Sequence, residues 1–147
     1  MNTETQNLGI DERLFCDILS TAEHNTALHT MGISITYLGP GTAGLKMFCD
    51  PKFSNHMGSI HGAVIAGLID NAMGLSMESS GRRGVTLEMS INYIAPVMEN
   101  TVVTAEGRVV YAGKKTAVIE ASLFTENGEL AAKGKGTFYL RPETNNG

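Results

Sequence analysis

Residues 55–70 read Asn-His-Met-Gly-Ser-Ile-His-Gly-Ala-Val-Ile-Ala-Gly-Leu-Ile-Asp, a polar loop that runs into an apolar segment with helical spacing. The apolar positions continue to about Ser79 and cover most of the circumference of a helix that is predicted to begin near His61. A helix with so narrow a polar face is buried on several sides. Ser59 is its expected N-cap. This long helix is therefore predicted to form the centre of the fold.

Asp70 lies in the middle of that apolar helix. An ionised carboxylate in such surroundings costs several kcal/mol unless it has a partner. One interpretation is that Asp70 is the acidic member of a catalytic site whose hydrogen-bond donors lie at the start of the helix. The alternative is that Asp70 lies on a solvated side of the helix, beside Asn71, and has no chemical role, because carboxylates of this kind do not always mark function.

The segments on both sides of the helix alternate apolar and polar residues, as strands do. An amphipathic helix over Ile10 to about Ala22, capped by Asp11, is expected to precede them. Asn127-Gly128 is a strong hairpin signal between the last two strands. The strands are predicted at residues 33–38 and 44–50 before the long helix, and at 84–94, 101–111, 116–125 and 130–140 after it. The last four are expected to form an antiparallel meander.

This order of elements predicts an α+β fold in which a curved antiparallel sheet wraps around one long central helix. The single domain is expected over residues 10–140, between a flexible N-terminal tail at 1–9 and a flexible C-terminal tail at 141–147. One sheet cannot cover a helix that is apolar nearly all round, and uncovered apolar surface is a liability. A second subunit is therefore expected to cover the remaining face.

Composition narrows the classes of partner. At 147 residues with a net charge of -4, the chain is long enough for one packed domain and has no basic stripe for nucleic acid. No signal peptide is recognisable, and no apolar run approaches the ~20 residues of a membrane span. Cys16 and Cys49 are far apart in the sequence, which favours a cytoplasmic protein. His24, His29 and His56 lack the spacing of metal ligands, so neither a metal nor another cofactor is predicted.

A spaced motif consists of Asn55, Gly58, His61-Gly62 and Asp70. This motif resembles the hotdog-fold acyl-CoA thioesterases of the PaaI-like family. Four further segments support the resemblance: residues 85–89, residues 95–96, the turn at 113–116 and the segment 132–136. The resemblance covers about residues 28–140. The chain departs from it at Ala63, where such proteins have a second glycine. The departure is expected to affect packing or substrate fit more than chemistry.

The resemblance implies hydrolysis of an aryl-acyl or medium-chain acyl-CoA to a free acid and CoA, without a metal or redox cofactor. It assigns to Asp70 the role of catalytic carboxylate, either as nucleophile or as general base on water. The backbone N–H of Gly62 would bind the thioester oxygen. Asn55 would help to hold the water or the carboxylate, His61 would shape the loop, and Thr86 would orient the nucleophilic water.

Physical chemistry is consistent with these roles. A donor at a helix start stabilises the negative charge that develops on the carbonyl oxygen, and losing it raises the barrier by about 2.7–4 kcal/mol. Gly62 and Asp70 are eight residues apart, so on one helix they are separated by about 12 Å and cannot contact the same carbonyl group. We therefore expect a homodimer in which Asp70 of one subunit faces Asn55 and Gly62 of the other. A homotetramer, a dimer of such dimers, is a separate expectation that this distance does not provide.

Each assignment has a structural alternative. His61 can be a histidine bonded to the backbone, Asn55 an ordinary turn residue, and Thr86 an ordinary strand residue. The two pairs of basic residues can be solvated turn charges or ligands of the CoA phosphates. These pairs are Arg82-Arg83 and Lys114-Lys115.

Two other functions compete with hydrolysis. A hydratase or dehydratase acting on acyl thioesters needs an acid-base pair that reaches the same substrate carbons. A non-catalytic acyl-CoA binding protein would need only the pocket, and a fold alone does not exclude it.

Overall fold

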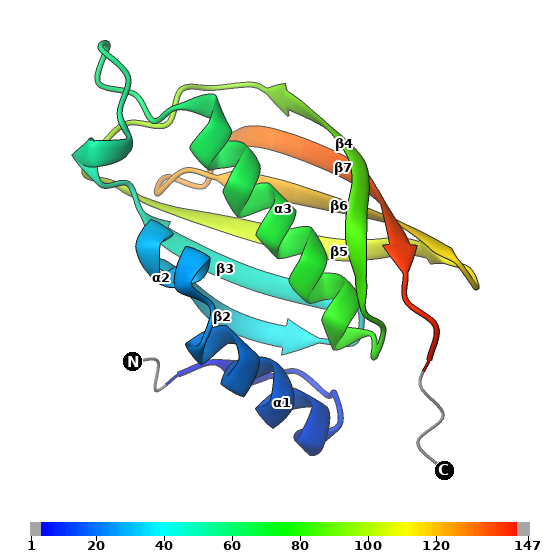
Figure 1. Ribbon diagram of the computed structural model, residues 1–147. Helices are drawn as coiled ribbons and strands as arrows, with labels where there is room; N and C mark the ends of the chain where they lie inside the picture. The colour runs from blue at the N-terminus through cyan, green and yellow to red at the C-terminus, as the bar shows by residue number, and fades with distance from the viewer. Residues whose placement is uncertain (1–3, 144–147) are drawn as a thin grey trace.

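The computed structural model describes residues 4–143. Its helices are α1 (Glu12–Glu23), α2 (Thr26–Met31), the 3-10 turn η1 (Pro51–Phe53) and α3 (Gly62–Ser79). Its strands are β1 (Gln6–Asn7), β2 (Ile33–Gly39), β3 (Thr42–Phe48), β4 (Gly84–Tyr93), β5 (Val102–Ala112), β6 (Thr116–Phe124) and β7 (Leu130–Leu140). They form one sheet in the order β1-β2-β3-β5-β6-β7-β4, which curves around α3 (Figure 1).

The long helix α3 lies at the centre of the fold, as predicted. Ile69 and Ala72 have no exposed surface. Two strand glycines allow α3 to approach the sheet closely. A Cβ at Gly107 would overlap the carbonyl of Ala72, and a Cβ at Gly134 would overlap the side chain of Ile69. The curved antiparallel sheet around one helix is therefore confirmed, with one addition: β1 joins β2 in parallel.

The predicted four-strand meander is wrong in its first member. β5, β6 and β7 follow one another as antiparallel neighbours, but β5 also pairs with β3, whereas β4 pairs with β7 at the end of the sheet. After α3 the chain turns back along the helix to the far edge, and residues 94–101 then carry it across to β3 (Figure 1). As an edge strand with a bulge, β4 leaves Val85 48% and Leu87 59% exposed.

The N-terminal segment predicted to be a flexible tail over residues 1–9 is partly a strand. Besides the pairing of β1 with β2, the N–H of Leu8 donates to the carbonyl of Leu38 at 2.8 Å. At the other end, the N–H of Arg141 donates to the carbonyl of Arg83 at 2.8 Å, so backbone hydrogen bonds continue into the predicted C-terminal tail. Residues 1–3 and 144–147 of the two predicted tails lie outside the described residues.

Helix α2 was not expected from the sequence. Its ends are defined by Asn25, whose side chain accepts from two backbone N–H groups, and by Gly32 in the left-handed conformation at φ 69°. Helix α1, whose Asp11 cap is confirmed, packs on α3, and α2 packs on β2. Met31 lies so close to Gly67 that a Cβ there would be 3.0 Å from its methyl carbon. The chain itself thus covers part of the helix face that we expected a second subunit to bury.

Candidate active site

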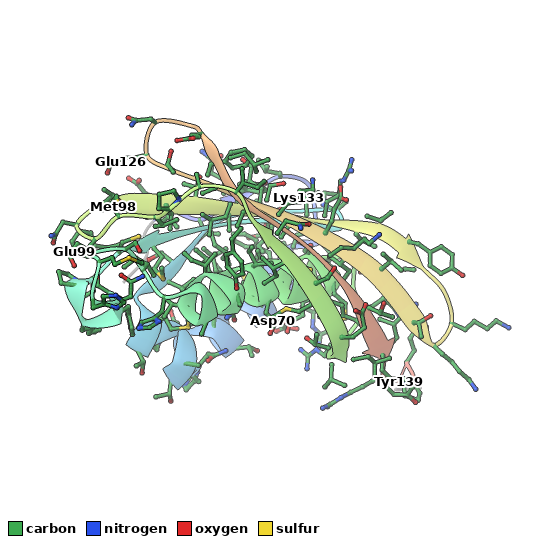
Figure 2. All side chains as sticks on the ribbon, turned by 90° about the horizontal axis from the view of Figure 1, so that it is seen from above. Asp70, Met98, Glu99, Glu126, Lys133 and Tyr139 are labelled. Carbon is green, nitrogen blue, oxygen red and sulfur yellow. The ribbon has the colours of Figure 1, made fainter. Side chains whose placement is uncertain are left out.

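Asp70 and Thr86, two of the predicted site residues, are in direct contact. The hydroxyl of Thr86 donates a hydrogen bond of 2.8 Å to Oδ1 of Asp70. The contact arises because β4 turns back along α3 after the turn at Ser80-Gly81. Asp70 is half-buried and lies on the side of α3 that faces away from the centre of the sheet (Figure 2). The carboxylate therefore has the polar partner that its apolar surroundings require.

A hollow of about 280 Å³ opens beside this pair. Its walls come from α3, from the α1–α2 region and from the start of β4. The lining includes Ile18, Thr21, Asn25, Leu28, Asn71, Gly74, Leu75, Glu78, Val85, Thr86 and Phe138. Burial raises the pKa of Glu78 above its ordinary value, and the nearby positive charge of Arg83 opposes this rise. The hollow therefore combines an apolar floor with several polar groups near Asp70.

The loop before α3 is organised by Asn55. Its Oδ1 accepts from the N–H groups of Met57 at 2.8 Å and Ser59 at 3.2 Å, and its Nδ2 donates to the hydroxyl of Ser59 at 2.8 Å. These are the contacts of a turn residue, the alternative considered for this position. Ser59 is consequently not the N-cap of α3. The cap position belongs to His61, whose exposed side chain makes no capping hydrogen bond.

Gly62 is the first residue of α3, where backbone N–H groups have no carbonyl partner one turn earlier. The hydroxyl of Tyr93, at the end of β4, donates to the carbonyl of Gly62 at 2.8 Å. A Cβ at Gly62 would lie 3.2 Å from the Tyr93 ring, so the ring packs directly on the glycine. Sequence reasoning missed Tyr93, because its contact with Gly62 exists only where β4 runs back along α3. Ala63, beside Gly62, is exposed.

Within one chain the two halves of the predicted site lie apart. Asp70 and Thr86 line the first hollow, whereas Gly62 and Tyr93 line a second hollow with Ile94. The helical rise between positions 62 and 70 is about 12 Å. The structure therefore brings together Asp70 with Thr86, and His61-Gly62 with the Asn55 loop, but not these two groups with each other.

The predicted basic residues gather at the other end of α3. Arg82 donates to the carbonyls of Gly113 and Lys114, each at 3.2 Å, and its Nε lies 3.5 Å from Glu143. It therefore ties the start of β4 to the β5–β6 hairpin. Arg141, which sequence reasoning missed, lines the same hollow as Arg82 and its exposed neighbour Arg83. Lys114 and Lys115 are exposed at the hairpin turn.

Within residues 4–143, no helix combines the length and the hydrophobicity that a membrane-spanning segment needs. In the same part of the chain, no three His, Cys, Asp or Glu side chains gather as the ligands of a metal ion would.

A curved antiparallel sheet around one long central helix is the hotdog fold, and here that helix carries a carboxylate halfway along its length. The sequence model of the thioesterase superfamily matches residues 57–132, more than half of the chain, and the chain belongs to this family. Two predictions are thereby confirmed: the chain is PaaI-like, and it is a thioesterase enzyme.

Three known proteins illustrate the similarity. Human acyl-coenzyme A thioesterase 13 is 32% identical over 113 residues, covering 74% of this chain and 79% of that protein. The PaaI protein of the E. coli phenylacetic acid degradation operon, 21% identical, has the same fold with a TM-score of 0.87 over 92% of this chain and 99% of its own. A hypothetical thioesterase protein of Streptococcus pneumoniae, solved with coenzyme A, is 27% identical with a TM-score of 0.73 over 76% and 87% of the two chains.

Proposed function

We propose that this enzyme hydrolyses aryl-acyl or medium-chain acyl-CoA thioesters at a site that two subunits share. The observation that carries the proposal is the hydrogen bond from Thr86 to Asp70 beside a hollow that could accept an acyl group. The coenzyme A bound by the Streptococcus pneumoniae relative and the name of the human relative support the choice of substrate. The predicted cytoplasmic location rests on two cysteines, Cys16 and Cys49, that are both free.

In the proposed reaction, Asp70 takes a proton from a water molecule whose oxygen attacks the thioester carbonyl carbon. The N–H of Gly62 from the other subunit donates to the oxyanion that forms, where the helix N-terminus adds partial positive charge. The C–S bond then breaks, and the CoA thiolate receives the proton from Asp70. If Asp70 attacks the carbonyl carbon directly, an acid anhydride forms first and water cleaves it. After a single turnover in ¹⁸O-labelled water, label in the Asp70 side chain would demonstrate direct attack, with water cleaving the anhydride at the Asp70 carbonyl carbon.

A two-fold dimer can be built on the free edge of β4. Unpaired edge strands with apolar side chains are prone to pair with another strand, and Tyr93 and Leu87 on β4 are 56% and 59% exposed. Antiparallel pairing of β4 with its copy, centred between Met89 and Ser90, would place Thr86 opposite the partner's Tyr93. Asp70 would then approach the partner's Gly62, because within each chain Thr86 is hydrogen-bonded to Asp70 and Tyr93 is hydrogen-bonded to Gly62. The predicted homotetramer, a dimer of such dimers, stays a prediction.

The assay that tests this function measures thiol release from a panel of saturated acyl-CoAs. We expect free CoA and the matching carboxylic acid in equal amounts. Conversion of an enoyl-CoA without thiol release would instead identify a hydratase. Tight binding of acyl-CoA without turnover would identify a non-catalytic binding protein.

Thr86→Val should lower kcat about 10- to 100-fold with little change in KM, because a hydrogen bond to a charged group contributes about 1.5–3 kcal/mol. The valine retains the shape of the side chain but leaves one oxygen of Asp70 without its donor. Thr86→Ser, which restores the hydroxyl, should recover most of kcat. Steady-state kinetics measures both variants. Equal kcat for the valine variant and the wild type would show that Thr86 does not position the carboxylate.

The exposed cations at the end of α3 are proposed to bind the CoA phosphates. Arg83 and Arg141 are the exposed candidates, with Lys114 and Lys115 as further ones, whereas Arg82 is engaged with the hairpin. Arg83→Gln and Arg141→Gln should each raise KM for acyl-CoA roughly fivefold, since an exposed ion pair contributes up to about 1 kcal/mol.

The control for these variants is an acyl thioester of N-acetylcysteamine, which lacks the phosphates and should be hydrolysed equally by wild type and variants. Lys46→Gln, an exposed lysine on β3, is the matched charge control and should leave KM unchanged. A KM for acyl-CoA that neither arginine variant alters would exclude this phosphate site.

A further inference from the structure

One end of the molecule gathers much of the chain's positive charge. The net charge is -4, yet five of the 11 basic residues lie around the start of β4, the end of β7 and the β5–β6 hairpin. Hydrogen bonds hold these segments together, because the N–H of Arg141 donates to the carbonyl of Arg83 and the side chain of Arg82 donates to the carbonyl of Lys114. An acidic protein thus carries a local basic surface.

Most of these cations have no partner within the fold. Arg82 is the exception, since its Nε lies 3.5 Å from Glu143. Within residues 4–143, the side chains of the others make neither a hydrogen bond nor an ion pair. These others are Arg83, Lys114, Lys115 and Arg141. Their charges are therefore available to a partner outside the chain.

Three apolar or aromatic side chains beside these cations are strongly exposed. Tyr111 is 59% exposed, Val110 is 54% exposed and Tyr139 is 41% exposed. Val110 and Tyr111 lie at the end of β5, directly before the hairpin turn with its two lysines. Figure 2 shows Tyr139 at the end of the sheet opposite to Met98. Apolar and basic groups are therefore mixed at this end of the sheet.

The two tyrosines lie on the same face of the sheet. Successive residues of a strand alternate between its faces. The residues on either side of Tyr139 are buried, so its own side chain points away from α3. Tyr111 pairs with Val118 and Tyr139 pairs with Thr116, two positions of β6 that share this outer face. The tyrosines, Val110 and the two lysines of the turn are called the hairpin surface below.

We propose that the hairpin surface docks on an anionic lipid bilayer. A tyrosine has an apolar ring and a polar tip, which suits the boundary between headgroups and acyl chains. Each lysine near an anionic bilayer strengthens binding about fivefold. A small soluble anion would satisfy the lysines but leave Val110 and Tyr111 in water. The inference goes beyond the proposed function, because it places the enzyme at a membrane surface without any spanning segment.

The small size of the hairpin surface favours a bilayer over a protein partner. A stable protein–protein interface takes about 20–30 residues from each side. A bilayer can instead be held by a few amphipathic anchors together with basic charge. Val110 and Tyr111 provide such anchors from a single hairpin, and Tyr139 adds one from the neighbouring part of the sheet.

Flotation of the whole protein with lipid vesicles tests the proposal. At low ionic strength the wild type should float with an equimolar mixture of phosphatidylcholine and phosphatidylglycerol, but not with phosphatidylcholine alone. High salt should release it, because ions screen the attraction. Lys114→Gln should weaken binding about fivefold. Tyr111→Ser should weaken it several-fold, and so should Tyr139→Ser, whose place on another strand keeps the test independent of the folding of the hairpin.

The matched control is Phe48→Ser, because Phe48 is an aromatic residue of β3 that is 50% exposed and lies outside the hairpin surface. It should float like the wild type, and thermal unfolding should show that every variant is folded. The assay needs no turnover and contains no acyl-CoA, so its failure is distinct from a failure of the proposed function.

Four results would overturn the proposal. They are the absence of flotation with the mixed vesicles, equal flotation with both kinds of vesicle, and a loss in Phe48→Ser as large as that in Tyr111→Ser. The fourth is retention of the protein on immobilised polyglutamate without flotation, which would identify an acidic protein as the partner.

Discussion

Asp70→Asn should lower kcat for thioester hydrolysis by about 10²- to 10⁴-fold, the usual contribution of a general base. Asparagine has nearly the same shape but neither accepts a proton from water nor attacks a carbonyl efficiently. Its side-chain oxygen can still accept the hydrogen bond from Thr86, which is 2.8 Å long in the wild type. The fold should therefore be retained while the chemistry is lost.

Steady-state kinetics and thermal unfolding, measured on the same preparation, separate these two effects. The expected result is a melting temperature close to that of the wild type together with the loss of turnover. Asp17→Asn is the matched control, because Asp17 is an exposed carboxylate on α1 that does not line the hollow beside Asp70. Activity of Asp70→Asn within a few fold of the wild type would show that Asp70 is a structural carboxylate.

Gly62→Val should lower kcat by about 10²- to 10³-fold, the effect of losing one oxyanion donor. The Cβ would already lie 3.2 Å from the Tyr93 ring, and a branched side chain would force that ring or the first turn of α3 to move. The N–H of residue 62 would then no longer point at the thioester oxygen. Initial rates at saturating acyl-CoA measure the loss.

Tyr93→Phe is the control for Gly62→Val, since it keeps the ring against Gly62 and removes only the hydroxyl that bonds to the Gly62 carbonyl. We expect it to lose only a few fold in kcat. Near-normal turnover by a folded Gly62→Val variant would mean that the oxyanion is bound elsewhere.

The central helix and the fold class could be predicted because local patterns determine them. The apolar spacing of α3 and the period of two in the strands are properties of neighbouring residues. The resemblance then pointed to Asp70 and Thr86, which the structure joins by a hydrogen bond. No local pattern contains that contact, since it depends on β4 running back along the helix.

The errors concern features that depend on distant parts of the chain. The position of β4 beside β7 follows from where the chain leaves α3, and β1 exists only because the edge of β2 accepts it. Asn55 makes the contacts of a turn residue within its own chain, and its role at the thioester stays a prediction. Arg141 enters the basic cluster from the opposite end of the sequence, a juxtaposition that spacing cannot reveal.

In the proposed dimer, each active site takes Asp70 from one chain and Gly62 from the other. The most direct measurement mixes the inactive variants Asp70→Asn and Gly62→Val, refolds them together and assays thiol release. In a mixed two-fold dimer, one site collects both substitutions and the other collects neither. Random pairing makes about half of the dimers mixed, so about a quarter of all sites should be intact and a quarter of wild-type activity should return. If native mass spectrometry shows mixed dimers but no activity returns, each chain builds its site alone and the shared site is wrong.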